Sequence, residues 1–186
     1  MTELYIRSAC SADLEPFAAA FGDHRYFTDR LTRQKNGRGV LFLAWLDYSL
    51  AGNVYLWLEE AEERPIREQL PGVALLTHLQ VRDELRNRGV GQALVAAVER
   101  RLVEAGRDRV ALAVLTDNHD AARLYDRLDY RDWGHGEVIC YAQRRLPGGG
   151  ILEEPERCHV LTKDLAKPSA PPPRTESSVV GVSRQG

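Results

Sequence analysis

The N-terminal third of the chain switches between strand-like and helix-like hydrophobic patterns. Residues 4–7 alternate as in a short strand. Apolar residues at helical spacing follow a cap at Ser11 or Asp13, and a second helical pattern covers His24 to Gln34. We therefore expect one strand followed by two helices.

Two apolar runs rich in strand-forming residues come next, Val40 to Leu46 and Ala51 to Leu58. They predict an antiparallel hairpin in which the four residues 47–50 form the connection. Residues 59–63 then contain four glutamates. Such a run is usually a solvated loop, but it also fits an acidic lip that attracts a cationic amine. Both interpretations stay open from the sequence.

The middle of the chain predicts a strand, a helix and a second strand. Val73 to Val81 is strand-like, and apolar residues then recur every four positions from Val90 to Ala105, before Gly106 ends the helix. Val110 to Leu115 is almost wholly apolar, as in a strand that is covered on both faces within a parallel pair. This order predicts a right-handed crossover between two parallel strands.

The bend between the first of these strands and the helix reads Arg-Asn-Arg-Gly-Val-Gly, residues 86–91. Glycines let the main chain approach an anion closely, and the first turn of a helix offers free N–H groups and a positive dipole end. Arg86 and Arg88 could add charge-assisted bonds. Gln92 rules out a Walker loop, and Leu94 stands where a Rossmann fingerprint needs glycine. Alone, the segment fits either a phosphate loop or a basic turn before an amphipathic helix.

Further polar and aromatic residues follow the second strand in a recognisable order. Asn118 begins a short helix, Tyr125 lies seven residues later, and a turn with the sequence Leu128-Asp129-Tyr130 ends the helix. With the loop before them, these residues resemble the GNAT superfamily of N-acetyltransferases. In that family a strand, an Asn, a Tyr and a Leu-Gly-Phe/Tyr turn follow a Gln/Arg-x-x-Gly-x-Gly/Ala loop. Asp129 replaces the usual glycine, and Asp tolerates left-handed turn conformations better than most residues.

The resemblance implies an α/β GNAT fold with a mixed central sheet of about six to seven strands, helices on both faces, and a parallel central pair around acetyl-CoA. Main-chain groups of Leu79 and Val81 would bond the pantetheine arm, and so would Asn118, whose other interpretation is a plain helix cap. The acyl donor would be acetyl-CoA, without a metal. The residues expected at its phosphates are Arg86, Asn87, Arg88, Gly89, Val90 and Gly91.

Tyr125 is the expected acid for the leaving thiolate, because a phenol is protonated at neutral pH. It would otherwise be a core aromatic residue of an amphipathic helix. The base is less well defined. The expected face of the preceding strand carries Leu75, Thr77 and Val81, and His78 points to the other side unless a bulge intervenes. His78, with a packed structural role as its alternative, and Glu59 acting through water both remain candidates.

The C-terminal third is less regular in its hydrophobic pattern. Residues 133–136 predict a turn, Val138 to Tyr141 a strand, residues 147–150 a flexible break, and Cys158 to Thr162 a last strand. Residues 167–186 are rich in Pro and Ser and predict a disordered tail.

The composition, 44% hydrophobic and 28% charged over 186 residues, fits a single domain over residues 1–166. A net charge of −2 gives no electrostatic reason to expect a nucleic-acid partner. The three cysteines lack metal-ligand spacing. Because the chain shows neither a leader pattern nor a long apolar span, we expect no membrane partner and a cytoplasmic location.

These features predict direct acetyl transfer from acetyl-CoA to a primary amine in a ternary complex. The acidic run favours a small cationic acceptor, such as an aminoglycoside-like, polyamine-like or amino-acid-derived compound. Protein or peptide N-acetylation is the alternative among enzymes. A non-catalytic acyl-CoA-binding module is the alternative outside them, because the cofactor loop is better supported than any base. A homodimer is compatible with all three readings.

Overall fold

The computed structural model describes residues 3–165, and the C-terminal segment predicted as a disordered tail lies outside them. The strands are β1 (Leu4–Ser8), β2 (Gly39–Leu46), β3 (Ser49–Trp57), β4 (Ala74–Val81), β5 (Arg109–Leu115), β6 (Arg131–Asp132), β7 (Val138–Arg145) and β8 (Ile151–Asp164). The α-helices are α1 (Leu14–Phe21), α2 (His24–Lys35), α3 (Arg64–Gln69), α4 (Val90–Glu104) and α5 (His119–Arg127). Short 3₁₀ turns, η1 (Ser11–Asp13) and η2 (Asp83–Leu85), precede α1 and follow β4.

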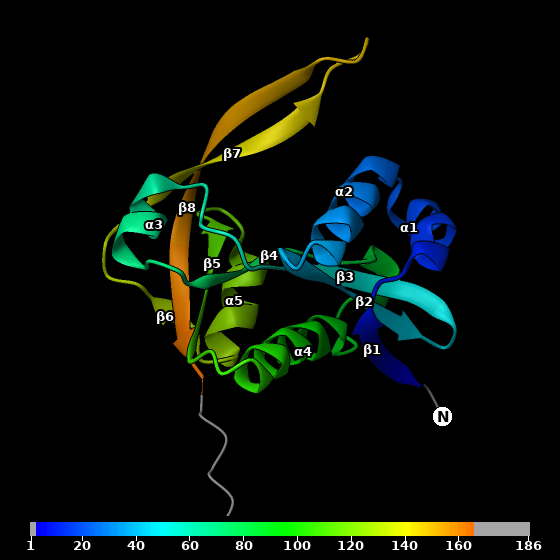
Figure 1. Ribbon diagram of the computed structural model, residues 1–186, viewed down its shortest axis with the longest axis horizontal. Helices are drawn as coiled ribbons and strands as arrows, with labels where there is room; N and C mark the ends of the chain where they lie inside the picture. Colours follow the sequence, from blue (N-terminus) through cyan, green and yellow to red (C-terminus); the bar gives the residue numbers. More distant parts are fainter. Residues whose placement is uncertain (1–2, 166–186) are drawn as a thin grey trace, which may run out of the picture.

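The strands form one eight-stranded sheet in the order β1-β2-β3-β4-β5-β8-β6, with β7 paired to β8 (Figure 1). Among the described strands, β4 and β5 are the one parallel pair, and α4 makes the crossover between them. The predicted mixed sheet with a parallel central pair is therefore confirmed. The two-residue β6 is the strand that the sequence pattern did not indicate.

Helices cover both faces of the sheet (Figure 1). On one face, α4 and α5 pack on a core that includes Leu76, Leu94 and Leu112. On the other, α1, α2 and α3 pack on a second core that includes Phe27 and Leu75. The four-residue apolar period of α4 is fully buried against the sheet, and each such side chain contributes about 1.5–3 kcal/mol.

The β2–β3 connection is two residues long and not the four predicted. Leu46 pairs with Ser49 and Trp45 with Leu50. Ser49 and Leu50, which were expected in the loop, therefore belong to β3. The turn residues Asp47 and Tyr48 have φ values of 47° and 67°. Positive φ at both central positions gives a tight hairpin turn the twist that the flanking strands require.

The predicted flexible break at residues 147–150 is the tip of a long hairpin. Leu146 N–H donates to the Gly150 carbonyl at 2.9 Å, and β7 and β8 pair from Val138/Cys158 to Arg145/Ile151. Both strands are longer than predicted, because backbone pairing continues where no alternating core face is needed. We call this hairpin, residues 138–158, the arm; it projects beyond the sheet on the side of α2 (Figure 1).

The acidic run lies in a loop, as the charge pattern indicates, but a short helix follows it. Helix α3 has Pro65 in its first turn, where a missing N–H is tolerated, and it buries Ile66 against the sheet. One apolar residue in a six-residue helix is too weak a periodic signal to read from the sequence.

Candidate active site

The glycine-containing loop is placed where a phosphate can reach backbone N–H groups. Gly89 is the N-cap residue of α4 with φ 79°, and Asn87 is also left-handed with φ 58°. The loop follows the carboxyl end of β4, the edge at which open α/β sheets bind ligands. The first N–H groups of the 15-residue α4 have no partner within the helix. The geometry therefore suits an anion.

The side chains of the loop are less specialised than its backbone. Arg86 is exposed and pairs with Asp83 at 2.7 Å, and Arg88 is also exposed. An exposed pair of this kind contributes at most about 1 kcal/mol, so a phosphate can compete for Arg86. A Cβ atom on Gly91 would lie 3.4 Å from Leu124 Cδ2 and 3.8 Å from Val81 Cγ2. The absence of a side chain at Gly91 therefore keeps the space between β4 and α5 open.

The parallel strands β4 and β5 separate soon after they begin. They pair at Ala74/Val110 and Leu75/Ala111, and no pair follows between them. Beyond Leu75, the edge of β4 that faces β5 pairs with no other strand among the described residues, and this stretch includes Leu79 and Val81. An extended ligand with its own amides can satisfy such an edge. This is the feature of the fold that best fits a pantetheine arm.

Helix α5 carries the remaining residues expected at the cofactor. The Asn118 side-chain oxygen accepts from the Ala121 N–H at 3.1 Å, so this residue does act as a helix cap. Tyr125 is 5% exposed and packs edge-on against Tyr130. Burial raises the pKa of Tyr125 well above its ordinary value. Within residues 3–165 the Tyr125 hydroxyl makes no side-chain hydrogen bond, whereas the Tyr130 hydroxyl donates to Glu99 at 3.0 Å.

Asp129, the departure from the family pattern, adopts the left-handed conformation that a glycine would, with φ 65°. Tyr130 N–H still bonds the Tyr125 carbonyl at 3.0 Å across this turn. The turn at residues 128–130 therefore keeps its backbone geometry although Asp129 replaces the usual glycine.

A bulge in β4 changes which residues face α2. Asn53 of β3 pairs with Gln80 and Tyr55 with Thr77, so His78 and Leu79 together oppose a single residue of β3. His78 has φ 52°, as the extra residue of a bulge often does. Its ring packs against that of Tyr26 of α2 with a centroid distance of 4.2 Å and an interplanar angle of 31°.

The bulge corrects the face that strict alternation predicted. Leu75 and Thr77 do face α2, but Val81 packs with Leu79 in the core beneath α4. His78 instead turns toward α2. From the sequence alone, this orientation was expected only if a bulge interrupted the strand. Its ring keeps solvent access, yet neighbouring protein atoms desolvate it and lower its pKa, and the charge of Arg30 lowers that pKa further.

His78 borders a cleft of about 850 Å³ between α2 and the arm. We call this the acceptor cleft. Its lining residues come from α1, α2, the strand ends and the arm: Phe21, Gly22, Asp23, Arg25, Tyr26, Asp29, Arg30, Arg33, Trp57, Glu62, His78, Tyr141, Gln143, Arg144 and Ile151. Figure 1 shows α2 and the arm rising from the same side of the sheet.

The acidic run contributes little to this cleft. In the part of the chain that the structure describes, Glu62 is the one carboxylate of this run that lines the cleft. Glu59 pairs with Arg33 Nη1 at 2.5 Å and with Arg38 Nη1 at 3.7 Å. Because both of its oxygens are engaged, Glu59 is a poor candidate for a base acting through water. The cleft instead contains four arginines.

The sequence analysis missed the α2 residues of the cleft. Tyr26, Arg30 and Arg33 recur at spacings of four and three, so they share one flank of the helix beside the buried Phe27 and Leu31. This row of one tyrosine and two arginines was the sequence pattern that could have indicated the cleft. No neighbouring residue distinguished it from an ordinary solvent-exposed helix face.

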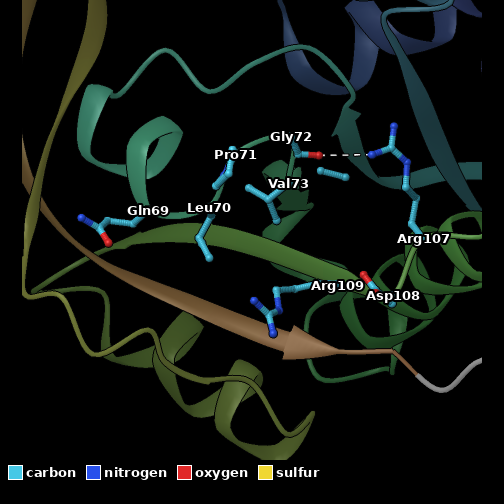
Figure 2. A pocket seen from close by; sticks show the side chains of 9 residues that line it. Gln69, Leu70, Pro71, Gly72, Val73, Arg107, Asp108 and Arg109 are labelled. Atoms are coloured by element: carbon cyan, nitrogen blue, oxygen red, sulfur yellow. Dashed lines mark hydrogen bonds between the residues drawn. The ribbon is translucent and has the colours of Figure 1, made fainter.

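A second cavity, of about 370 Å³, lies at the opposite end of β4 and β5. It is formed by residues 69–74 and 107–109, and Arg107 Nη1 donates to the Gly72 carbonyl across it at 3.2 Å (Figure 2). This is the amino end of the parallel pair, away from the phosphate loop, so we do not place the chemistry there.

No helix in residues 3–165 is long and apolar enough to cross a bilayer. Over the same residues, no group of three or more His, Cys, Asp or Glu side chains is arranged to hold a metal ion.

Known acetyltransferases are similar to this chain in sequence or in fold. An acetyltransferase of Photorhabdus laumondii is 33% identical over 69 residues, which are 37% of this chain and 48% of that protein, so the match spans about half of the relative's length. PaiA N-acetyltransferase of Thermoplasma acidophilum in complex with coenzyme A has a TM-score of 0.60 and 13% identity, covering 87% of this chain and 99% of the other.

A ribosomal-protein-alanine N-acetyltransferase of Brucella melitensis has a TM-score of 0.63 and 16% identity, covering 87% of this chain and 99% of the other. At such identities the structural likeness shows the fold alone. The model of the acetyltransferase (GNAT) family matches residues 6–130, about two thirds of the chain. The chain therefore belongs to the GNAT family of acetyltransferases.

Proposed function

We propose that this protein is an N-acetyltransferase that moves the acetyl group of acetyl-CoA directly to a primary amine in the acceptor cleft. One observation carries the proposal: β4 separates from β5 after Leu75 and then bulges at His78, beside the cleft. The unpaired edge of β4 thus runs from the phosphate loop to His78, which lies in β4 and lines the cleft.

The cofactor residues act mainly through the backbone. N–H groups of Gly89, Val90 and Gly91 at the start of α4 hold the pyrophosphate, helped by Asn87 and by the charges of Arg86 and Arg88. Main-chain groups of Leu79 and Val81 bond the pantetheine amides, and the free amide nitrogen of Asn118 can add a bond. When bound, acetyl-CoA supplies a reactive thioester, so positioning accounts for much of the catalysis.

Two side chains handle the protons. His78 accepts the proton that the attacking amine loses as the new C–N bond forms; its lowered pKa keeps the ring neutral and able to accept at neutral pH. Tyr125 donates its proton to the sulfur as the C–S bond breaks, and its raised pKa keeps the phenol protonated until then. The phenolate recovers a proton from solvent.

The acceptor is proposed to be a small amine. The sequence favoured a cationic compound because of the acidic run, but Glu59 is engaged by Arg33 and Arg38, and Glu62 is the glutamate of that run that lines the cleft. The electrostatic support for a polyamine-like acceptor is therefore small.

A peptide or protein amine is the second candidate. The cleft opens toward an arm with exposed apolar side chains, among them Tyr141 and Ile151, which could contact an extended chain. A fold relative named for ribosomal-protein alanine supports this reading as an analogy.

The test is thiol release from acetyl-CoA in the presence of amine panels, alongside a titration of the protein with acetyl-CoA. We expect saturable binding and turnover with small primary amines. Turnover with peptide N-termini alone would favour the second candidate. Binding without turnover on any amine would favour a non-catalytic acyl-CoA-binding module, and a lack of binding would overturn all three readings.

A further inference from the structure

Arg30 is held in an unusual place for a charged side chain. Its guanidinium lies 4.9 Å from the ring centroids of Tyr26 and Tyr55 and 5.4 Å from that of Trp57. The side chain is 21% exposed. Three aromatic rings on α2 and β3 thus hold the guanidinium beside the acceptor cleft, which Arg30 lines.

The charge of Arg30 is only partly balanced. Its one carboxylate contact in the described residues is Asp29 Oδ2 at 3.1 Å, and that oxygen also accepts from Arg33 Nε at 3.0 Å. Asp29 is 52% exposed, so this contact is screened by solvent. Arg30 Nε and the Tyr26 hydroxyl are buried without a hydrogen-bond partner. The guanidinium therefore keeps N–H groups that can bond a ligand in the cleft.

Arg30 also lies close to the proposed base. The Tyr26 ring contacts both residues, with its face toward the Arg30 guanidinium and a centroid distance of 4.2 Å to His78. Tyr26 therefore lies against both side chains, and Arg30 and His78 line the same cleft, so one small molecule can reach both. Asp23 and Glu62 also line the cleft and can attract the amine end of the same molecule.

We propose that Arg30 binds a carboxylate of the acceptor, so that the preferred substrate is a primary amine with a nearby carboxylate, as in an amino acid. This proposal rests on the acetyl transfer proposed above and names the substrate class of the same cleft. Arg30 then determines specificity: its fixed guanidinium donates to the carboxylate and so orients the amine toward His78.

The test compares amino acids with their carboxamides for the wild type and Arg30→Gln. Because loss of the carboxylate also lowers the pKa of the neighbouring amine, kcat/KM is expressed per uncharged amine. We expect kcat/KM of the wild type to favour the free acid by about 10-fold or more, as a charged hydrogen bond implies. In Arg30→Gln the acids should lose about that factor, while the carboxamides change by less than about threefold. Arg101→Gln, an exposed arginine at the far end of α4, is the matched control and should change neither.

A purely structural Arg30 would lower kcat/KM equally for acids and carboxamides, and that result would overturn the proposal. So would a wild-type preference for carboxamides or for polyamines over acids, which leaves acetyl transfer itself intact. Arg30→Lys covers the case in which Arg30→Gln does not fold, and it should keep part of the preference for acids.

A calorimetric titration of the same acid and carboxamide pairs into the CoA-saturated protein gives a readout that does not require turnover. Binding of the acid that is tighter than that of the amide, and lost in Arg30→Gln, supports the proposal; equal binding contradicts it. If the protein bound acids selectively but showed no turnover, the carboxylate site would be supported and the proposed transferase activity would be contradicted.

Discussion

The two halves of the candidate active site differ in what builds them. The cofactor half, residues 79–91 with α5, consists mostly of backbone groups set by one strand end, one loop and one helix start. The acceptor cleft consists of side chains from α1, α2, the ends of β3 and β4, and the arm. A contiguous backbone motif leaves a readable pattern in the sequence, whereas a cleft assembled from distant side chains does not.

The difference also concerns charge. The phosphate loop offers N–H groups and a helix dipole to an anion, with arginines that are exposed and exchangeable. In the cleft, Arg30 and Arg33 are fixed by aromatic rings and by Asp29 and Glu59. Substitutions should therefore separate the halves: backbone changes should affect the cofactor, and side-chain changes the acceptor and the proton transfers.

The largest effect is expected for Tyr125→Phe. Loss of the proton donor should lower kcat by roughly 100-fold, while binding of acetyl-CoA and thermal stability change little, because the hydroxyl makes no side-chain hydrogen bond in the described residues. Thiol-release kinetics and a melting curve measure both. In the control, Tyr130→Phe, a bond to Glu99 of 3.0 Å is lost, which should cost about 1–3 kcal/mol of stability but not kcat. Unchanged turnover in Tyr125→Phe would remove the proposed acid.

Gly89→Val should come next. A β-branched residue at φ 79° costs about 1–3 kcal/mol of local strain, and relief of that strain would misplace the first amides of α4. We expect acetyl-CoA to bind roughly 10-fold more weakly, as measured by titration calorimetry. Gly106→Val introduces the same strain at φ 73°, beyond the other end of α4, and should leave the affinity unchanged. Equal affinities in the two variants would contradict the phosphate assignment.

His78→Gln should have an effect of similar size on turnover, visible in the pH profile. The lowered pKa means that His78 loses its proton below the usual value of about 6.5, so its protonation should add a fall in kcat/KM as the pH drops through that lowered pKa, beyond the fall caused by protonation of the acceptor amine. The variant should lack this limb and be roughly 10-fold slower at neutral pH.

The same shift predicts a change in stability with pH. In the unfolded chain His78 takes up a proton at higher pH than in the folded protein, so its contribution to the free energy of unfolding should fall as the pH drops below about 6.5. Denaturant melts of the wild type and His78→Gln at several pH values check this. In the kinetic comparison, an identical acidic limb of the kcat/KM profile in the wild type and His78→Gln would assign the base elsewhere.

Glu62→Gln should have the smallest effect. Because Glu62 is an exposed residue of the cleft, its removal should change KM for a cationic amine by no more than about fivefold. Glu60→Gln, an exposed neighbour that is not among the lining residues of the cleft, is the control. A much larger rise in KM for Glu62→Gln would restore the acidic lip as a main determinant of the acceptor.

Several features were predictable because they are local. The apolar period of α4, the left-handed turn at Asp129 and the cap at Asn118 follow from short-range geometry, and the structure has all three. The hairpin at Asp47 and Tyr48 was assigned two residues too many, since turn length depends on the register of the paired strands.

By itself, the sequence determined the order of strand, glycine-containing loop, helix and strand, and with it the family and the proposed position of the cofactor. The tertiary structure alone decided which way His78 points, because a bulge depends on the register between β3 and β4. It also decided that Glu59 is engaged by Arg33 and that Arg30 lies among the rings of Tyr26, Tyr55 and Trp57. Residues so far apart in the chain meet only through packing, for which a single sequence carries no local signal.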